Sequence, residues 1–204
     1  MDADYFPRLS AAAQDISRQN TTVNSQINVL SLLMAPFLIV LAISLPVVVR
    51  LLYTADYLPV MPMVWAALPF MYFKSIYSPI AYLSLAHGDS RVYFVMELIY
   101  DLVFAAAVVV GYQYYGLLGA GIGLSLANLA DLLLLSLFYR KKYHFRFTRQ
   151  GAVLYLSQGA LLLGVLCCML AESAWMRYGI SGALCLVSLF YSFVQLKRLW
   201  RAKE

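Results

Sequence analysis

The feature that most constrains this chain is a series of six apolar stretches, each long enough to cross a bilayer. A hydrocarbon core of about 30 Å requires roughly 20 apolar residues in a helix. The composition agrees, because 63% of the residues are hydrophobic and only 12% are charged. We therefore predict an all-α, polytopic membrane helix bundle with about six transmembrane helices. The expected spans are Ile27–Leu52, Tyr57–Ala86, Val92–Tyr114, Leu117–Tyr139, Gly151–Ala171 and Ala174–Leu196.

The lysines and arginines lie on alternate connections between these spans. Twelve of the fifteen are in the amino-terminal segment 1–26, the second connection, the basic loop 140–150 and the tail 197–204. The opposite side has only Arg50 and Arg177, and Lys74 lies inside a span. The excess of basic residues on cytoplasmic loops predicts that both termini are cytoplasmic. An even number of spans likewise places both termini on the same side of the membrane.

The net charge of +5 does not imply a nucleic-acid partner, because basic residues beside spans set topology and contact anionic lipid headgroups. We expect no metal or cofactor, since the two histidines lie in separate connections without a ligand-like or triad-like neighbourhood. The three cysteines have apolar surroundings and are interpreted as inert thiols. No catalytic constellation is visible, so we expect that the protein is not an enzyme.

Glycines and prolines inside the spans predict how the helices pack. Gly119 and Gly123, continued by Ala127, form a small-xxx-small series that favours close helix approach over a phosphate-binding loop. Pro36 and Pro46 interrupt the first span. The second span contains four prolines: Pro59, Pro62, Pro69 and Pro79. Interior prolines free backbone carbonyls, which neighbouring helices or water then satisfy. Two such spans in sequence favour a bundle that bends or rocks.

Ionisable residues inside the spans are the candidate functional residues. A charged group at the bilayer centre costs about 3 kcal/mol on insertion scales, so it usually faces a partner or water. Helical rise places Lys74 roughly 18 Å and Asp101 roughly 15 Å from the cytoplasmic side, with the other carboxylates shallower. Glu97 and Asp101 are four residues apart, and Asn128 and Asp131 are three apart, so each pair is expected on one helix face. The candidates are Lys74, Glu97, Asp101, Asn128 and Asp131.

Two interpretations of these residues remain open. In the first, Lys74 neutralises Asp101 or Glu97 in a buried structural pair. In the second, the groups line a water-filled cavity for a polar or charged cargo. Three carboxylates and one lysine cannot all cancel, and the surplus is a place for a cation or proton to bind.

Several segments resemble polysaccharide flippases of the Wzx type, in the multidrug/oligosaccharidyl-lipid/polysaccharide exporter superfamily. DYFPRLSAAAQD is similar to the family's P-x-L-S stretch after a transmembrane hairpin, and LPVVVRLLYTADYLPVMPMVWAALPFMYF to its pattern of apolar helix, LLY, short Tyr-containing loop and next helix. LAHGDSRVYFVMELIYDLV resembles its cytoplasmic turn ahead of a helix with an acid, and YYGLLGAGIGLSLANLADLLLL its YGLLGAG helix start. The order and spacing of these motifs carry the resemblance across residues 4–142.

The resemblance implies transport of a lipid-linked oligosaccharide across a bacterial cytoplasmic membrane, in cell-surface polysaccharide or lipopolysaccharide biosynthesis. It implies that residues 27–139 are four helices of the exporter's C-terminal lobe and that residues 151–196 are an appended helix pair. The expected partners are membrane lipids, the lipid-linked glycan, and a missing N-terminal lobe or another membrane subunit. The chain is then part of a longer transporter. The alternative within the superfamily is a multidrug or small-solute exporter coupled to a cation.

Overall fold

The computed structural model describes residues 2–53, 55–171 and 173–201, and within these ranges the chain is helical and has no strand. This confirms the predicted all-α helix bundle. A short 3₁₀ turn, η1, precedes α3, and a π-helical turn, η2, runs directly into α6. The elements are α1 (Asp2–Ala12), α2 (Ile16–Leu52), η1 (Ala55–Val60), α3 (Met61–Ala86), α4 (Ser90–Lys142), α5 (Arg149–Met169), η2 (Trp175–Ile180) and α6 (Ser181–Arg201).

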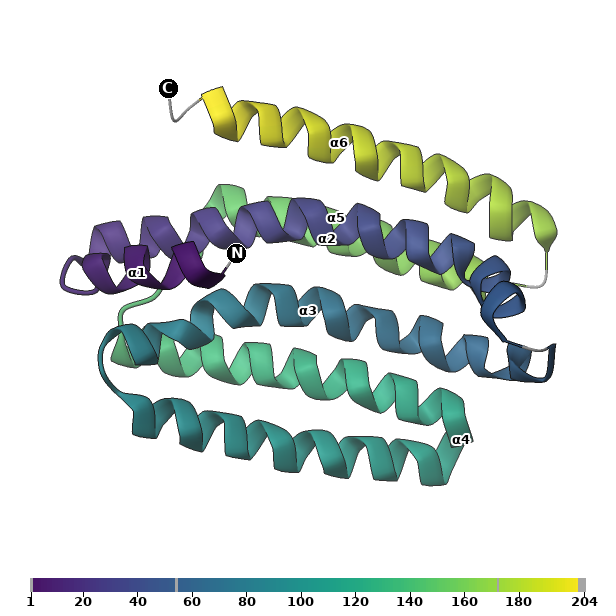
Figure 1. Cartoon of the computed structure of the whole chain (residues 1–204), viewed down its shortest axis with the longest axis horizontal. Coiled ribbons are helices and arrows are strands. Elements are labelled where there is room, and N and C mark those ends of the chain that lie inside the picture. Colours follow the sequence, from purple (N-terminus) through teal and green to yellow (C-terminus); the bar gives the residue numbers. More distant parts are fainter. Residues whose placement is uncertain (1, 54, 172, 202–204) are drawn as a thin grey trace.

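The long helices lie roughly side by side, with α3 in the interior of the bundle (Figure 1). On one side of α3 are α2 and α5, and α6 lies outside them. On the other side lies α4, whose two limbs run in opposite directions. Helix α1 and the C-terminal part of α6 lie at the same end of the bundle, where the α1–α2, α3–α4 and α4–α5 connections also lie (Figure 1). We call this the terminal end.

The reversal in the middle of α4 separates two of the expected spans. Tyr115 (φ −132°, ψ 16°) and Gly116 (φ 59°, ψ −142°) leave the helical conformation. A positive φ is accessible to glycine without the clash that a Cβ atom causes. The limbs on either side correspond to the predicted spans Val92–Tyr114 and Leu117–Tyr139, so Gly116 lies at the break that hydropathy indicated.

Four helices in the described part of the chain are long and apolar enough to cross a membrane: α2, α4, α5, and η2 together with α6. Because α4 folds back on itself, its two limbs correspond to two of the predicted spans. The predicted span Tyr57–Ala86 is not in this group, and η1 occupies its first residues. Lys74, the prolines and several tyrosines lower the hydropathy of α3. This helix tolerates them because α1, α2, α4 and α5 all contact it and cover much of its surface.

Helical structure extends beyond the expected spans at the terminal end. Helix α2 begins at Ile16, inside the polar segment 1–26, and Asp15 caps it by accepting hydrogen bonds from the backbone N–H groups of Ser17 and Arg18. Helix α6 continues through the basic tail as far as Arg201. In the loop 140–150, α4 runs to Lys142 and α5 begins at Arg149, so only a short non-helical segment separates them.

The interior prolines leave the helices unbroken. Helix α2 runs through Pro36 and Pro46, and α3 through Pro69 and Pro79. Proline at position 46 has no N–H group to bond the carbonyl of Ala42, four residues earlier. The indole Nε1–H of Trp65, on α3, donates to that carbonyl at 3.0 Å. A neighbouring helix thus satisfies the backbone group that the proline freed.

The glycine series of α4 packs as expected. A Cβ atom on Gly119 would collide with the backbone of Gly111, and one on Gly123 with the backbone of Ala107, both on the first limb. A Cβ atom on Gly121 would instead collide with the backbone of Met63 on α3. The second limb is therefore in close contact with two neighbours, and the small-residue packing prediction is confirmed.

Candidate functional site: a charged cluster between α3 and the limbs of α4

Three helical segments bring four of the five candidate residues together. Helix α3 contributes Lys74, the first limb of α4 contributes Glu97, and the second limb contributes Asn128 and Asp131. Tyr77 and Tyr100 complete what we call the charged cluster. Both tyrosines, Asn128 and Asp131 are buried, whereas Lys74 and Glu97 are half-buried. Polar groups from three helical segments thus lie together in this cluster.

The two tyrosines connect the charged members of the cluster. The Tyr77 hydroxyl donates to Glu97 Oε1 at 2.9 Å, and Asn128 Nδ2 donates to the Tyr100 hydroxyl at 2.7 Å. Lys74 Nζ lies 5.0 Å from the centroid of the Tyr100 ring and 5.6 Å from that of Tyr77. Both distances are within the range of cation–π attraction. The lysine is therefore held by aromatic faces.

This arrangement does not contain the structural ion pair that one interpretation predicted. In the described part of the chain, no carboxylate oxygen lies within ion-pairing distance of Lys74. Asp131 interacts electrostatically with both Glu97 and Lys74. Because Glu97 and Asp131 together oppose one ammonium group, the cluster has an unbalanced negative charge when all three are ionised.

One further atom in the cluster lacks a partner. Asn128 is fully buried, and its Oδ1 accepts no hydrogen bond in the described part of the chain. An unmade hydrogen bond of this kind typically costs about 1–3 kcal/mol. A buried amide oxygen without a partner can accept a hydrogen bond from a proton donor or coordinate a small cation.

Asp101 does not join the charged cluster, and its assignment to a cavity stays a prediction. Its side chain is exposed on the outer surface of the first limb, and within the described ranges it makes no hydrogen bond or ion pair. Glu97, four residues earlier, turns toward Tyr77. Two residues four positions apart differ in direction by about 40° around a helix. Here this angle separates the inward carboxylate of Glu97 from the outward carboxylate of Asp101.

Sequence reasoning missed a set of amide side chains at the terminal end. Gln19 and Asn24 of α2 donate to the carbonyls of Tyr143 and Arg146, and Asn24 Oδ1 accepts from the Thr148 backbone N–H at 2.9 Å. Asn20 bonds the same segment in both directions. These amides hydrogen-bond the backbone of the non-helical segment 143–148. The spacing of Asn20 and Asn24, one helical turn apart, was the available signal.

A second group joins two connections that are distant in sequence. Lys142 Nζ lies 3.0 Å from Asp89 Oδ2, and the Tyr143 hydroxyl donates to the same oxygen at 2.7 Å. The His87 ring packs on that of Tyr143, with centroids 4.7 Å apart. The hydrogen bonds from Tyr143 and Lys142 hold the pKa of the Asp89 carboxyl below its ordinary value. Asp89 is therefore ionised at neutral pH and ties the α3–α4 connection to the end of α4.

Helices α5 and α6 meet through a neutral polar cluster formed by Gln158, Ser188 and Ser192. Gln158 is fully buried, and its Nε2 donates to Ser192 Oγ at 2.6 Å and to the Ser188 carbonyl at 3.3 Å. The Ser188 hydroxyl donates back to Gln158 Oε1 at 2.7 Å. Both ends of the amide therefore have partners, and the cluster stabilises the packing of α5 against α6.

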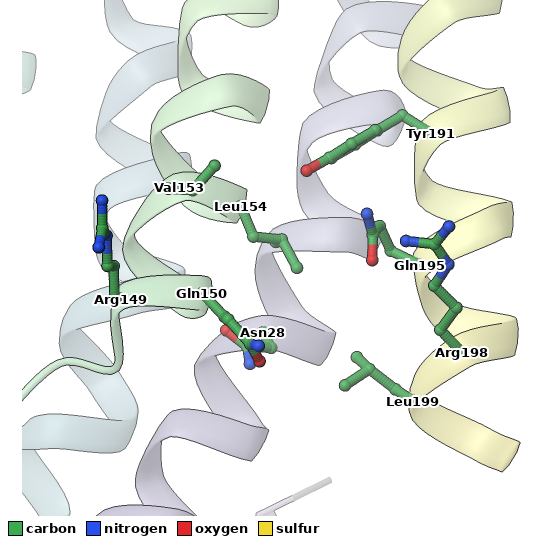
Figure 2. Close-up of a pocket in the computed structure, with 9 residues that line it drawn as sticks. All are labelled: Asn28, Arg149, Gln150, Val153, Leu154, Tyr191, Gln195, Arg198 and Leu199. Carbon is green, nitrogen blue, oxygen red and sulfur yellow. The ribbon is translucent and has the colours of Figure 1, made fainter. Parts of the chain in front are cut away.

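A cavity of about 590 Å³ lies near the terminal end between α2, α5 and α6. Figure 2 shows Tyr191, Gln195 and Arg198 extending from α6 toward the gap, with Asn28 and Gln150 close to each other on its opposite side. Asn28 Oδ1 is buried and has no partner in the described part of the chain. The Arg149 side chain extends away from α6 (Figure 2). One guanidinium, a phenol and several amides can hydrogen-bond an anionic or hydroxylated headgroup here.

A second cavity, of about 410 Å³, lies between α3, the second limb of α4 and α5. Its lining is almost entirely apolar and includes Phe73, Leu132, Phe147 and Leu163, and it suits a hydrocarbon chain. The two cavities differ in chemistry, and both adjoin α5.

Comparison of the chain with protein-family models, curated proteins and solved structures finds no match.

Proposed function

We propose that this chain forms part of a membrane transporter that moves a lipid-linked oligosaccharide from the inner to the outer leaflet of a bacterial cytoplasmic membrane. In this proposal both termini are cytoplasmic, and the activity serves cell-surface polysaccharide biosynthesis. A glycan headgroup cannot cross hydrocarbon without a large free-energy cost for its unpaired polar groups. Transport needs polar groups at membrane depth and makes or breaks no bond, so in this proposal the protein is a transporter and no catalytic residues are required.

The observation that carries the proposal is the charged cluster between α3 and the limbs of α4. Ionisable residues inside membrane spans are expensive to insert and commonly mark transport pathways. Here Lys74, Glu97 and Asp131 gather at one place, with an unbalanced charge and the unpartnered Oδ1 of Asn128. A cluster with a purely structural role is expected to have polar groups that pair with one another. The resemblance of residues 4–142 to the Wzx-type flippases adds the class of cargo.

The test is deletion of the gene in the bacterium that encodes it. We expect loss of surface polysaccharide and accumulation of the lipid-linked oligosaccharide at the inner leaflet. Wild type is expected to restore both, and Glu97→Gln to restore neither at matched expression. Normal surface polysaccharide in the deletion strain would overturn the proposed cargo. If Glu97→Gln and Lys74→Met each restored transport fully, the charged cluster would play no part in transport.

The surplus of carboxylates favours a second candidate function, a cation-coupled exporter of drugs or other small solutes. Glu97 and Asp131 face a single lysine, which leaves a site for a proton or sodium ion. This function predicts that the deletion strain retains its polysaccharide and accumulates a cationic dye such as ethidium. Dye efflux would then depend on Glu97 and Asp131 and would stop when the ion gradient is dissipated.

A further inference from the structure

The first limb of α4 has an outer face whose surroundings are incomplete. It lies at the edge of the bundle, with the second limb and α3 on one side only (Figure 1). In the most apolar stretch of α4 only 11% of the residues are buried, compared with 44% in α2. Phe94, Leu98, Leu102 and Val109 are all exposed along this face, at helical spacing. Such a stripe could face lipid were it uniformly apolar.

Asp101 makes contact with lipid alone costly. It lies among these apolar residues with its carboxyl group exposed, and no described residue bonds it. Helical rise places it about 16 Å from the start of the limb at Ser90 and about 20 Å from Tyr114, near the middle of the span. A carboxylate facing hydrocarbon at this depth costs about 3 kcal/mol or more. The face therefore requires a group that pairs with Asp101.

A second copy of this chain in the same orientation cannot supply that group. Lys74 is the basic residue placed inside a span, and it lies over the Tyr77 and Tyr100 rings. The other lysines and arginines are at the ends of helices or in connections, more than one side-chain length from mid-depth. Symmetric contact through this face would also bring two Asp101 carboxylates together, which is unfavourable.

We propose that the outer face of the first limb binds a membrane-spanning helix of different sequence that has a lysine or arginine at mid-depth, paired with Asp101. The apolar stripe supplies the packing surface, and Asp101 fixes the register of the partner along the membrane normal. A misregistered partner leaves both charges in hydrocarbon, so the pair selects the partner as well as stabilising it. The proposal does not depend on what the protein transports.

The test uses the full chain reconstituted in phosphatidylcholine vesicles, with association measured by energy transfer to three designed Leu/Ala transmembrane peptides. One peptide has a single central Lys, the second has Leu there, and the third has the Lys moved by two helical turns. We expect the central-Lys peptide to associate at least about tenfold more tightly than the other two, which corresponds to 1.4 kcal/mol. Asp101→Leu is expected to abolish this preference, and Glu97→Gln, on the covered side of the limb, to leave it unchanged.

Three outcomes would overturn the proposal. The first is equal association of the three peptides, or a Lys preference that survives Asp101→Leu. The second is self-association of labelled wild-type chains that Asp101→Leu abolishes, which would assign the face to a second copy. The third is rapid reaction of Asp101→Cys with a membrane-impermeant thiol reagent, which would show that the face borders water. Circular dichroism and gel filtration of each variant confirm that it is folded, and no readout involves transport.

Discussion

The charged cluster between α3 and the limbs of α4 and the neutral cluster between α5 and α6 differ in how completely their polar groups are satisfied. Gln158 has partners for both ends of its amide, and all members are uncharged. In the charged cluster, Asn128 Oδ1 has no partner in the described part of the chain, and two carboxylates oppose one lysine. A satisfied neutral group stabilises a helix pair at modest gain. An unsatisfied charged cluster lowers the stability of the fold, and a functional role explains it better than a structural one.

The largest expected effect is therefore on transport, from Glu97→Gln. The substitution removes the carboxylate charge, and the amide oxygen of glutamine can still accept the hydrogen bond from the Tyr77 hydroxyl. We expect the transport rate to fall at least about tenfold with little change in thermal stability. Tyr77→Phe should give a smaller loss, and Tyr112→Phe, an exposed position on the same limb, none. If Glu97→Gln lowered the thermal stability enough to account for the loss of transport, the charged cluster would be structural, like the neutral cluster.

Gln158→Leu should show the opposite pattern. It removes three hydrogen bonds between α5 and α6, but Ser188 and Ser192 can turn their hydroxyls to helix carbonyls. We expect a loss of about 1–2 kcal/mol in the free energy of unfolding in detergent, with transport nearly unchanged. Gln150→Leu, an exposed glutamine on the same helix, is the matched control. A tenfold loss of transport without destabilisation would give the neutral cluster a functional role.

The smallest expected effect is on thermal stability, from Asp89 at the terminal end. This exposed carboxylate is charged, and Lys142 and Tyr143 pair with it. Because Tyr143 and Lys142 hold its pKa below the ordinary value, Asp89 stabilises the folded state above that value. This contribution disappears as the pH falls through the lowered pKa. Thermal unfolding of wild type and Asp89→Asn should thus differ at pH 7 and converge in acid. A difference that persists at low pH would mean that the contact acts through packing.

Hydropathy and residue type were sufficient to predict the helix bundle, the break near Gly116 and the packing of Gly119 and Gly123. These features depend on local composition and on the absence of a side chain. The direction of Asp101 could not be predicted, because α4 is apolar on nearly all sides and its sequence has no polar face to define the rotation. The bonds from Gln19, Asn20 and Asn24 to residues 143–146 join segments more than 120 positions apart. Nothing local to either segment specifies that pairing.

The two-residue reversal at Tyr115 and Gly116 has a consequence for biogenesis. With so short a turn, we expect the limbs of α4 to enter the bilayer as one helical hairpin rather than as two independent segments. Glu97, Asp101 and Asp131 are then inserted in a single event, and their combined unfavourable free energy is offset by the apolar residues of both limbs together. A longer flexible turn would allow the translocation machinery to reject the more polar limb by itself. Gly116 thus helps to decide whether the charged cluster is assembled at all.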